Sequence, residues 1–123
     1  MTVVQKMQDF ETSIKTNAVS ARTALKNAMT EGKTANQVAK DMGMLEAIQL
    51  TTGVLLAIKG QSPVSEEQWL SISEILSEKE KTVSTELSDG IVNGAEQEYL
   101  ANLLGIKETV THLLESHKQL SLV

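Results

Sequence analysis

The stretch from Met42 to Ile58 constrains the fold most, because its apolar residues fall on nearly every side of a helical projection. It carries a single charge, Glu46. A helix that is apolar all round must be covered by other helices, by a partner or by lipid. The stretch is slightly short for a membrane span and holds Gln49 and two glycines, which favours a buried core helix. We therefore expect the rest of the chain to cover it.

Polar caps divide the chain into four helical segments. In each, a polar residue is followed three residues later by Glu or Gln, a pair that satisfies exposed N–H groups at a helix N-terminus. The pairs are Thr2 with Gln5, Thr34 with Gln37, Ser65 with Gln68 and Asn93 with Glu96, and Ser62 before Pro63 is an alternative third start. Gly32, Gly60 and Gly90 then follow the first three segments as stop signals. The pattern predicts helices over about residues 3–31, 35–59, 66–88 and 94–119.

Each predicted helix carries apolar residues at steps of three and four, and the last, from Tyr99 to Leu120, is the most clearly amphipathic. The residues between the caps do not repeat, which indicates four helices rather than a solenoid. Short connections make neighbouring helices antiparallel. We expect residues 1–123 to form one all-α domain, an antiparallel up-down-up-down four-helix bundle. Two open hairpins that close by dimerisation are the alternative.

The second predicted helix has a face of small residues that is a candidate interface. Glycine in a helix interior costs up to about 1 kcal/mol relative to alanine, and close packing against another backbone is a plausible compensation. Large apolar faces rimmed by polar residues mark interfaces. The candidate interface residues on this helix are Gly43, Glu46, Leu50, Gly53 and Ala57. The helix either lies inside the bundle or joins two subunits, and membrane insertion is a third alternative.

Charge is distributed unevenly along the chain, whose formal net charge is −5. Residues 1–60 hold seven basic and five acidic side chains, and residues 61–123 hold four basic and eleven acidic ones. Such asymmetry bears on partners rather than on fold. The third predicted helix contributes Glu74, Glu78, Glu80 and Glu86 as further candidate interface residues. This surface is either simply solvated or a docking surface for a basic partner, including the basic half of another copy.

Catalytic signatures are absent from the sequence. It has no cysteine, and its two histidines, His112 and His117, are five residues apart and so lie on different faces of a helix. The paired Glu-x-x-His motifs of di-iron bundles, a nucleophile elbow and a phosphate-binding glycine loop are all missing. We therefore expect no enzyme activity, no catalytic residue, no metal site and no cofactor.

These observations favour a non-enzymatic helical assembly or adaptor protein that acts by protein–protein contact. Its partner is expected to be a protein or a second copy of the chain. One arginine and a net charge of −5 argue against nucleic acid, and neither a membrane nor a small-molecule substrate is expected. The composition resembles that of phage components, secretion-system accessories and regulatory adaptors. The alternative function is a small acidic inhibitor or effector that docks on a basic surface of a target.

The N-terminus lacks a basic segment followed by an apolar run, so no secretory signal peptide is predicted. The expected location is the cytoplasm, or a virion, or the exterior by a route without a cleavable signal.

Overall fold

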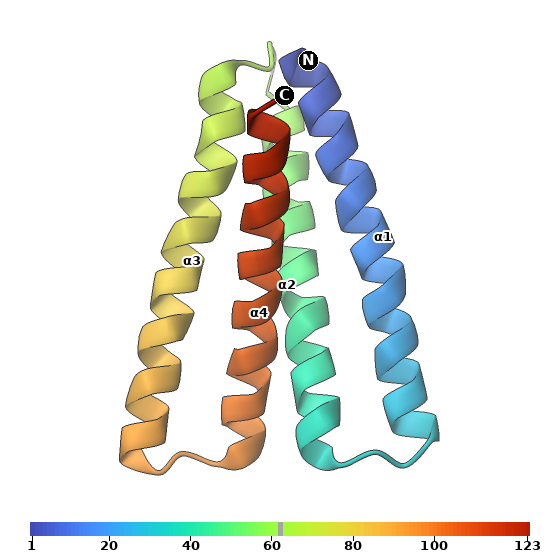
Figure 1. Ribbon diagram of the computed structural model, residues 1–123, viewed down its shortest axis with the longest axis vertical. Coiled ribbons are helices and arrows are strands. Elements are labelled where there is room, and N and C mark those ends of the chain that lie inside the picture. Colours follow the sequence, from blue (N-terminus) through green and yellow to red (C-terminus); the bar gives the residue numbers. More distant parts are fainter. Residues whose placement is uncertain (62) are drawn as a thin grey trace.

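A computed structural model describes residues 1–61 and 63–123 of the chain, and its regular elements are four helices (Figure 1). They are α1 (Val3–Thr30), α2 (Ala35–Lys59), α3 (Glu66–Asn93) and α4 (Gln97–Ser121). Helices α1 and α3 run in one direction along the bundle, and α2 and α4 run in the other. The predicted all-α, up-down-up-down four-helix bundle is therefore confirmed.

Three of the predicted helix starts are present. The Thr2 hydroxyl accepts from the Gln5 N–H at 3.2 Å, and the Gln5 side chain accepts from the Thr2 N–H at 3.0 Å. Ser65 and Gln68 form the same reciprocal pair. Thr34 caps α2, with its side chain accepting from the Gln37 N–H. The alternative third start at Ser62 lies outside the described residues.

The end predicted for the third helix at Gly90 is wrong. Helix α3 continues to Asn93 and ends where Gly94 takes a left-handed conformation with φ +71°. Gly90 is buried, and a Cβ added there would lie 2.8 Å from Cδ2 of Leu100. The absence of a side chain at Gly90 therefore leaves space for Leu100 in the first turn of α4. Gly90 does not end α3.

The cap predicted for the fourth helix at Asn93 is also wrong, because Asn93 is still part of α3. Helix α4 starts at Gln97 with Glu96 as its N-cap, and no side-chain hydrogen bond caps it. The extra turn at the end of α3 displaces the start of α4 by three residues.

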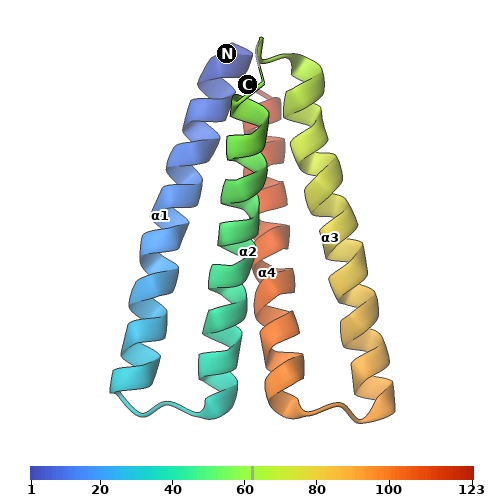
Figure 2. The same cartoon turned by 180° about the vertical axis from the view of Figure 1, so that it is seen from behind.

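The two central helices are α2 and α4, which lie side by side, while α1 and α3 lie on opposite sides of this pair (Figures 1 and 2). The outer helices converge at the end that carries both chain termini. They diverge toward the end that carries the α1–α2 and α3–α4 connections. The bundle is thus closed at one end and open at the other.

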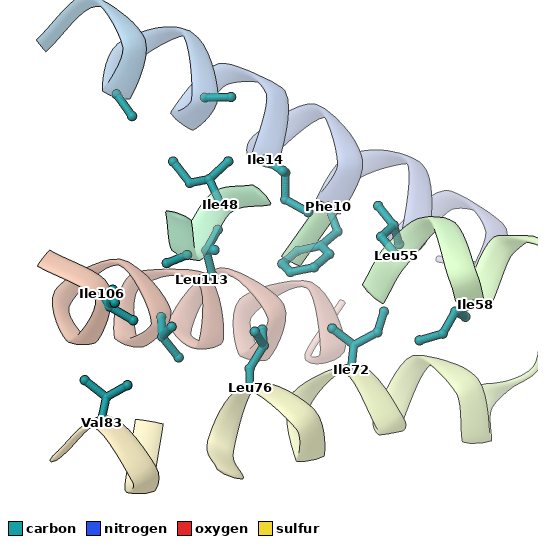
Figure 3. Packing of buried hydrophobic residues seen from close by; sticks show 14 of the residues in the cluster. Phe10, Ile14, Ile48, Leu55, Ile58, Ile72, Leu76, Val83, Ile106 and Leu113 are labelled. Atoms are coloured by element: carbon teal, nitrogen blue, oxygen red, sulfur yellow. The ribbon is translucent and has the colours of Figure 1, made fainter. Parts of the chain in front are cut away.

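Apolar side chains from all four helices meet between the central pair and the outer helices (Figure 3). Phe10 of α1 lies among them, in edge-to-face contact with Trp69 of α3 at a centroid distance of 5.7 Å. With few aromatic residues, the core is filled mainly by Ile, Leu, Val, Met and Ala. The buried apolar residues include Ile14, Ile48, Leu55, Ile72, Leu76, Val83, Ile106 and Leu113.

Candidate interaction surface

The central helices cross in backbone contact at two glycines. A Cβ added to Gly43 would lie 2.2 Å from the carbonyl oxygen of Asn102, and one added to Gly105 would lie 2.1 Å from that of Lys40. Real Cβ atoms do not approach backbone so closely, so neither position accepts a side chain without separating the helices. The Asn102 side chain also donates to the carbonyl of Ala39 at 3.1 Å.

The close backbone approach expected at Gly43 therefore occurs between two helices of one chain, and Gly43 is buried there. Sequence reasoning missed its partner, Gly105. The available signal was a glycine in the middle of the most clearly amphipathic helix, where glycine usually has a packing reason.

The outward face of α2 is exposed and largely apolar. Gly53 has no atom within 4 Å of an added Cβ, and Leu50 and Leu56 are 39% and 60% exposed. The members of this face, which we call the α2 stripe, are Met42, Glu46, Gln49, Leu50, Gly53, Leu56 and Ala57, and all are exposed. Their spacing of three and four residues places them along one side of the helix.

The expectation that the stretch from Met42 to Ile58 is covered on all sides is therefore wrong along the α2 stripe. Its other sides are covered, and Ala47, Ile48 and Leu55 are buried. The other helices pack against one side of α2, and the α2 stripe lies on the side turned away from them along the whole length of the helix (Figure 2). Among the described residues, α2 is the helix whose length and composition would suit a membrane span, with 39% of its most apolar window buried.

One basic side chain of α1, Lys15, flanks the part of the α2 stripe near Leu56. Lys15 and Leu56 line one small hollow of about 210 Å³, together with Glu11, Ile14, Thr52 and Leu55. Glu11 pairs with Lys15 at 3.2 Å and also accepts from Lys59 of α2, and these two ammonium groups lower the pKa of its carboxyl. The contacts hold α1 beside α2 and bring Lys15 to the edge of the stripe.

Basic residues also flank the lower part of the α2 stripe. Leu25 of α1 lines a hollow of about 240 Å³ with Met42 and Glu46 of α2, along with Leu45, Gln49 and Asn102. The same Leu25 lines a second hollow, on α1 itself, with Arg22, Lys26, Met29 and Thr30. Arg22 and Lys26 therefore lie close to the lower end of the stripe. We call the α2 stripe with Lys15, Arg22 and Lys26 the α1–α2 face.

The acidic residues of α3 lie on the opposite side of the molecule from α1 (Figure 1). Glu74, Glu78 and Glu86 are exposed, as expected of a candidate docking surface. Glu80 is half-buried, because its carboxylate accepts a hydrogen bond from the Thr111 hydroxyl of α4 at 2.6 Å. It therefore faces the neighbouring helix rather than the outer surface of α3.

The outer surface of α3 also contains further acidic and apolar residues. Glu67 and Asp89 are exposed, and Leu70 and Ile75 are 52% and 42% exposed. Helix α3 holds seven acidic and two basic residues, for a net charge of −5, whereas α1 holds four basic and two acidic, for a net charge of +2. The two outer helices thus carry opposite charge on opposite sides of the central pair.

The histidines occupy separate environments. His117 is buried and stacks on Trp69 with ring centroids 3.9 Å apart, and its Nε2–H donates to the Trp69 carbonyl at 2.8 Å. Burial lowers the pKa of His117, the Trp69 carbonyl opposes that shift, and the charge of Lys6 adds to it. His112 is exposed on α4, beside Glu108 in a groove between α1 and the central pair. Residues 1–61 and 63–123 contain no group of three His, Asp or Glu side chains that could hold a metal ion.

Comparison with protein-family models, with curated proteins and with solved structures finds no match for this chain. Its fold is that of an all-α four-helix bundle. Its surface presents two outer faces of opposite charge, one of which borders an exposed apolar stripe.

Proposed function

We propose that the protein is a non-enzymatic assembly protein whose copies associate head to tail. The side of the bundle formed by the acidic helix α3 in one copy contacts the side formed by the basic helix α1 in the next. The observation that carries this proposal is the placement of net charges of +2 and −5 on helices at opposite sides of the bundle.

Opposite charges on separate surfaces favour contact between two different surfaces of neighbouring copies. They disfavour contact between the same surface of two copies. Complementary potentials speed the encounter of partners and penalise contacts between like charges. A contact between two different surfaces leaves one of each free at every step, so copies can close into a ring or continue as a filament. The proposed product is therefore an assembly with several copies instead of a two-fold dimer.

Light scattering across a salt and concentration series tests the proposal. Mass should increase with protein concentration at low salt and fall as salt is added, because the Debye length shrinks from about 30 Å at 0.01 M to about 10 Å at 0.1 M. A mass that stays monomeric at low salt and at every concentration would contradict self-assembly. It would leave an adaptor that binds other proteins.

A second candidate function is an acidic effector or inhibitor that docks on a basic surface of another protein. The exposed carboxylates of Glu74, Glu78 and Glu86 support it. The test compares capture of partners by the wild type and by a variant with Glu74, Glu78, Glu80 and Glu86 changed to Gln. The matched control changes Glu98, Glu108 and Glu115 of α4 and its N-cap residue Glu96 to Gln. Equal capture by all three proteins would argue against an acidic docking surface on α3.

A further inference from the structure

The two halves of the chain are structurally equivalent at a separation of 62 residues. Helix α2 begins at Ala35 and α4 at Gln97, and both helices have 25 residues. Helices α1 and α3 both have 28 residues. The left-handed glycines that follow them, Gly32 and Gly94, are also 62 residues apart. The bundle therefore consists of two helical hairpins of matching dimensions.

The same separation relates the buried positions of the two hairpins. In the central helices, Asp41, Gly43, Ala47, Ile48, Thr51 and Leu55 correspond to Leu103, Gly105, Thr109, Val110, Leu113 and His117, and all twelve are buried. In the outer helices, Met7, Phe10, Ile14, Ala21 and Ala28 correspond to Trp69, Ile72, Leu76, Val83 and Gly90, which are buried as well. The chain thus repeats in its pattern of burial, although few of the paired residues are identical.

The contact between the hairpins is reciprocal. Gly43 faces the backbone at Asn102, while Gly105 faces the backbone at Lys40, and these positions are again 62 residues apart. Equivalent surfaces of α2 and α4 therefore meet each other across an approximate two-fold axis along the bundle. A comparison of equivalent positions on α4 and α2 therefore indicates which residue types the fold tolerates on each side of α2.

The outward faces of these two equivalent helices differ in chemistry from Leu50 onward, whereas Met42 and Glu46 are matched by the exposed Leu104 and Glu108. Four exposed residues of the α2 stripe, Leu50, Gly53, Leu56 and Ala57, are apolar or small. Their equivalents on α4 are His112, Glu115, Lys118 and Gln119, which are also exposed. The α4 face shows that polar side chains are compatible with this position in the hairpin. Folding of the hairpin therefore does not account for the apolar character of the α2 stripe, which points to a contact.

We propose that the α2 stripe is the surface that binds α3 of a second copy of this chain. This inference rests on the head-to-tail association proposed above. Charge favours an acidic occupant. Lys15 lines a hollow with Leu56 of the stripe, and Arg22 and Lys26 line a second hollow with Leu25, the residue that also lies against Met42 and Glu46. The outer surface of α3 supplies that chemistry, with exposed carboxylates such as Glu74 and Glu78 beside exposed apolar residues.

Dimensions are also compatible with this contact. At 1.5 Å per residue, α3 is about 42 Å long and α2 is about 38 Å long. An amphipathic helix of one molecule commonly lays its apolar residues into an apolar groove of another. Leu70 and Ile75 are exposed on different sides of α3, five residues apart, so each borders the exposed carboxylates from its own side, and one of the two would contact the α2 stripe.

A pair of matched variants tests the contact by light scattering and sedimentation. Leu50→Glu with Ala57→Glu changes the α2 stripe, and His112→Glu with Gln119→Glu makes the same change of charge at the equivalent positions of α4. We expect the first variant to weaken association at least tenfold and the second to associate as the wild type does. Circular dichroism should show equal helicity in both.

Disulfide cross-linking identifies the occupant directly, because the natural chain has no cysteine. Gly53→Cys places a thiol at the centre of the stripe, where an added Cβ meets open space. This variant is mixed with Glu74→Cys, Glu78→Cys or Thr85→Cys, and with Thr111→Cys as the control on α4, in the presence of diamide. We expect cross-links to at least one α3 position and none to Thr111→Cys.

The outcomes separate this inference from the proposed function. Equal association by the two double variants, while the wild type assembles, would overturn the α2 stripe as the contact and leave head-to-tail assembly standing. Rapid dimerisation of Gly53→Cys alone would overturn α3 as the occupant, because α2 would then meet α2. A wild type that stays monomeric under all conditions would overturn both proposals.

Discussion

Gly43 and Gly105 each occupy the point on their helix where the backbone of the other helix passes, and an added Cβ at either would lie within 2.2 Å of a carbonyl oxygen. The atom that such a Cβ would meet is backbone in both cases, so a change of rotamer cannot relieve the overlap. The separation of the central helices therefore depends on the absence of two side chains.

Substitution of these glycines by alanine should destabilise the fold. We expect Gly43→Ala and Gly105→Ala each to lower the free energy of unfolding by about 2–4 kcal/mol, as overpacked core substitutions do. The matched control is Gly53→Ala, whose Cβ meets open space and should raise stability by up to about 1 kcal/mol through helix propensity. Urea denaturation measures all three, and equal effects would contradict the close crossing.

Gly94 should be sensitive for a different reason, namely its backbone conformation. Its φ of +71° is left-handed, and an added Cβ there meets no neighbouring atom. Gly94→Ala should therefore lower stability by about 1–2 kcal/mol, the cost of a left-handed non-glycine residue. Gly94→Asn should cost less, because asparagine tolerates this conformation better. Thermal denaturation measures the stability of both variants. An equal loss of stability in the two would contradict a conformational cause.

His117 should make stability depend on pH. Its pKa is lowered in the folded state, mainly by burial, so the unfolded state binds more protons just below the ordinary histidine pKa of about 6.5. Stability is then fully present above that pH and decreases as pH falls toward the folded pKa, by at most about 1.4 kcal/mol per pH unit. Urea midpoints at pH 5.5, 6.0, 7.0 and 8.0 measure the slope.

Two variants test whether the dependence of stability on pH comes from His117. His117→Gln removes the titrating ring and should flatten the dependence between pH 5.5 and 7, although it also lowers stability overall because it disturbs the contact with Trp69. His112→Gln, which changes the exposed histidine of α4, is the control for replacing a histidine by glutamine. A slope that survives in His117→Gln would assign it to another group.

Two amides that join the central helices differ in burial and should differ in importance. The Asn102 side chain is half-buried and donates to the Ala39 carbonyl at 3.1 Å, whereas the Asn36 side chain donates to the exposed side chain of Gln97 at 3.1 Å. Loss of a partly buried hydrogen bond costs about 1 kcal/mol, and exposed substitutions usually stay within about 0.5 kcal/mol. Asn102→Ala should therefore destabilise the protein more than Asn36→Ala, as measured by urea denaturation.

The sequence predicted the helices better than their arrangement. Capping pairs such as Thr2 with Gln5 are local, so they could be read without knowing the neighbours. Periodicity predicts an apolar face on α3, where Trp69 and Leu76 are buried, but it did not predict the exposed side of α2, where Met42 and Leu56 lie. It could not give the angles between helices or the side of α2 on which the other helices pack, and the α2 stripe lies on the side that they leave uncovered.

Glycines were the least predictable residues, because one residue type serves two purposes. Gly32 follows α1 with a left-handed φ of +68°, as its position suggested. Gly90 also stands after a run of residues predicted to be helical, but it lies inside α3. Its role depends on Leu100 of α4, which packs against it. The equivalence of the two hairpins was also hidden, because it lies in which positions are buried and not in residue identity.

The convergence of the helices at the end that holds residues 1 and 123 places packed side chains beside segments that are usually held by few contacts. Terminal segments normally exchange their amide hydrogens fastest, because few contacts hold them. Here the first turns of α1 and the last turns of α4 adjoin the packed cluster of Phe10, Trp69 and His117. The amides around Phe10, Trp69 and His117 should therefore be among the slowest to exchange, and proteolytic nicking should begin at the connections after Thr30 and Asn93.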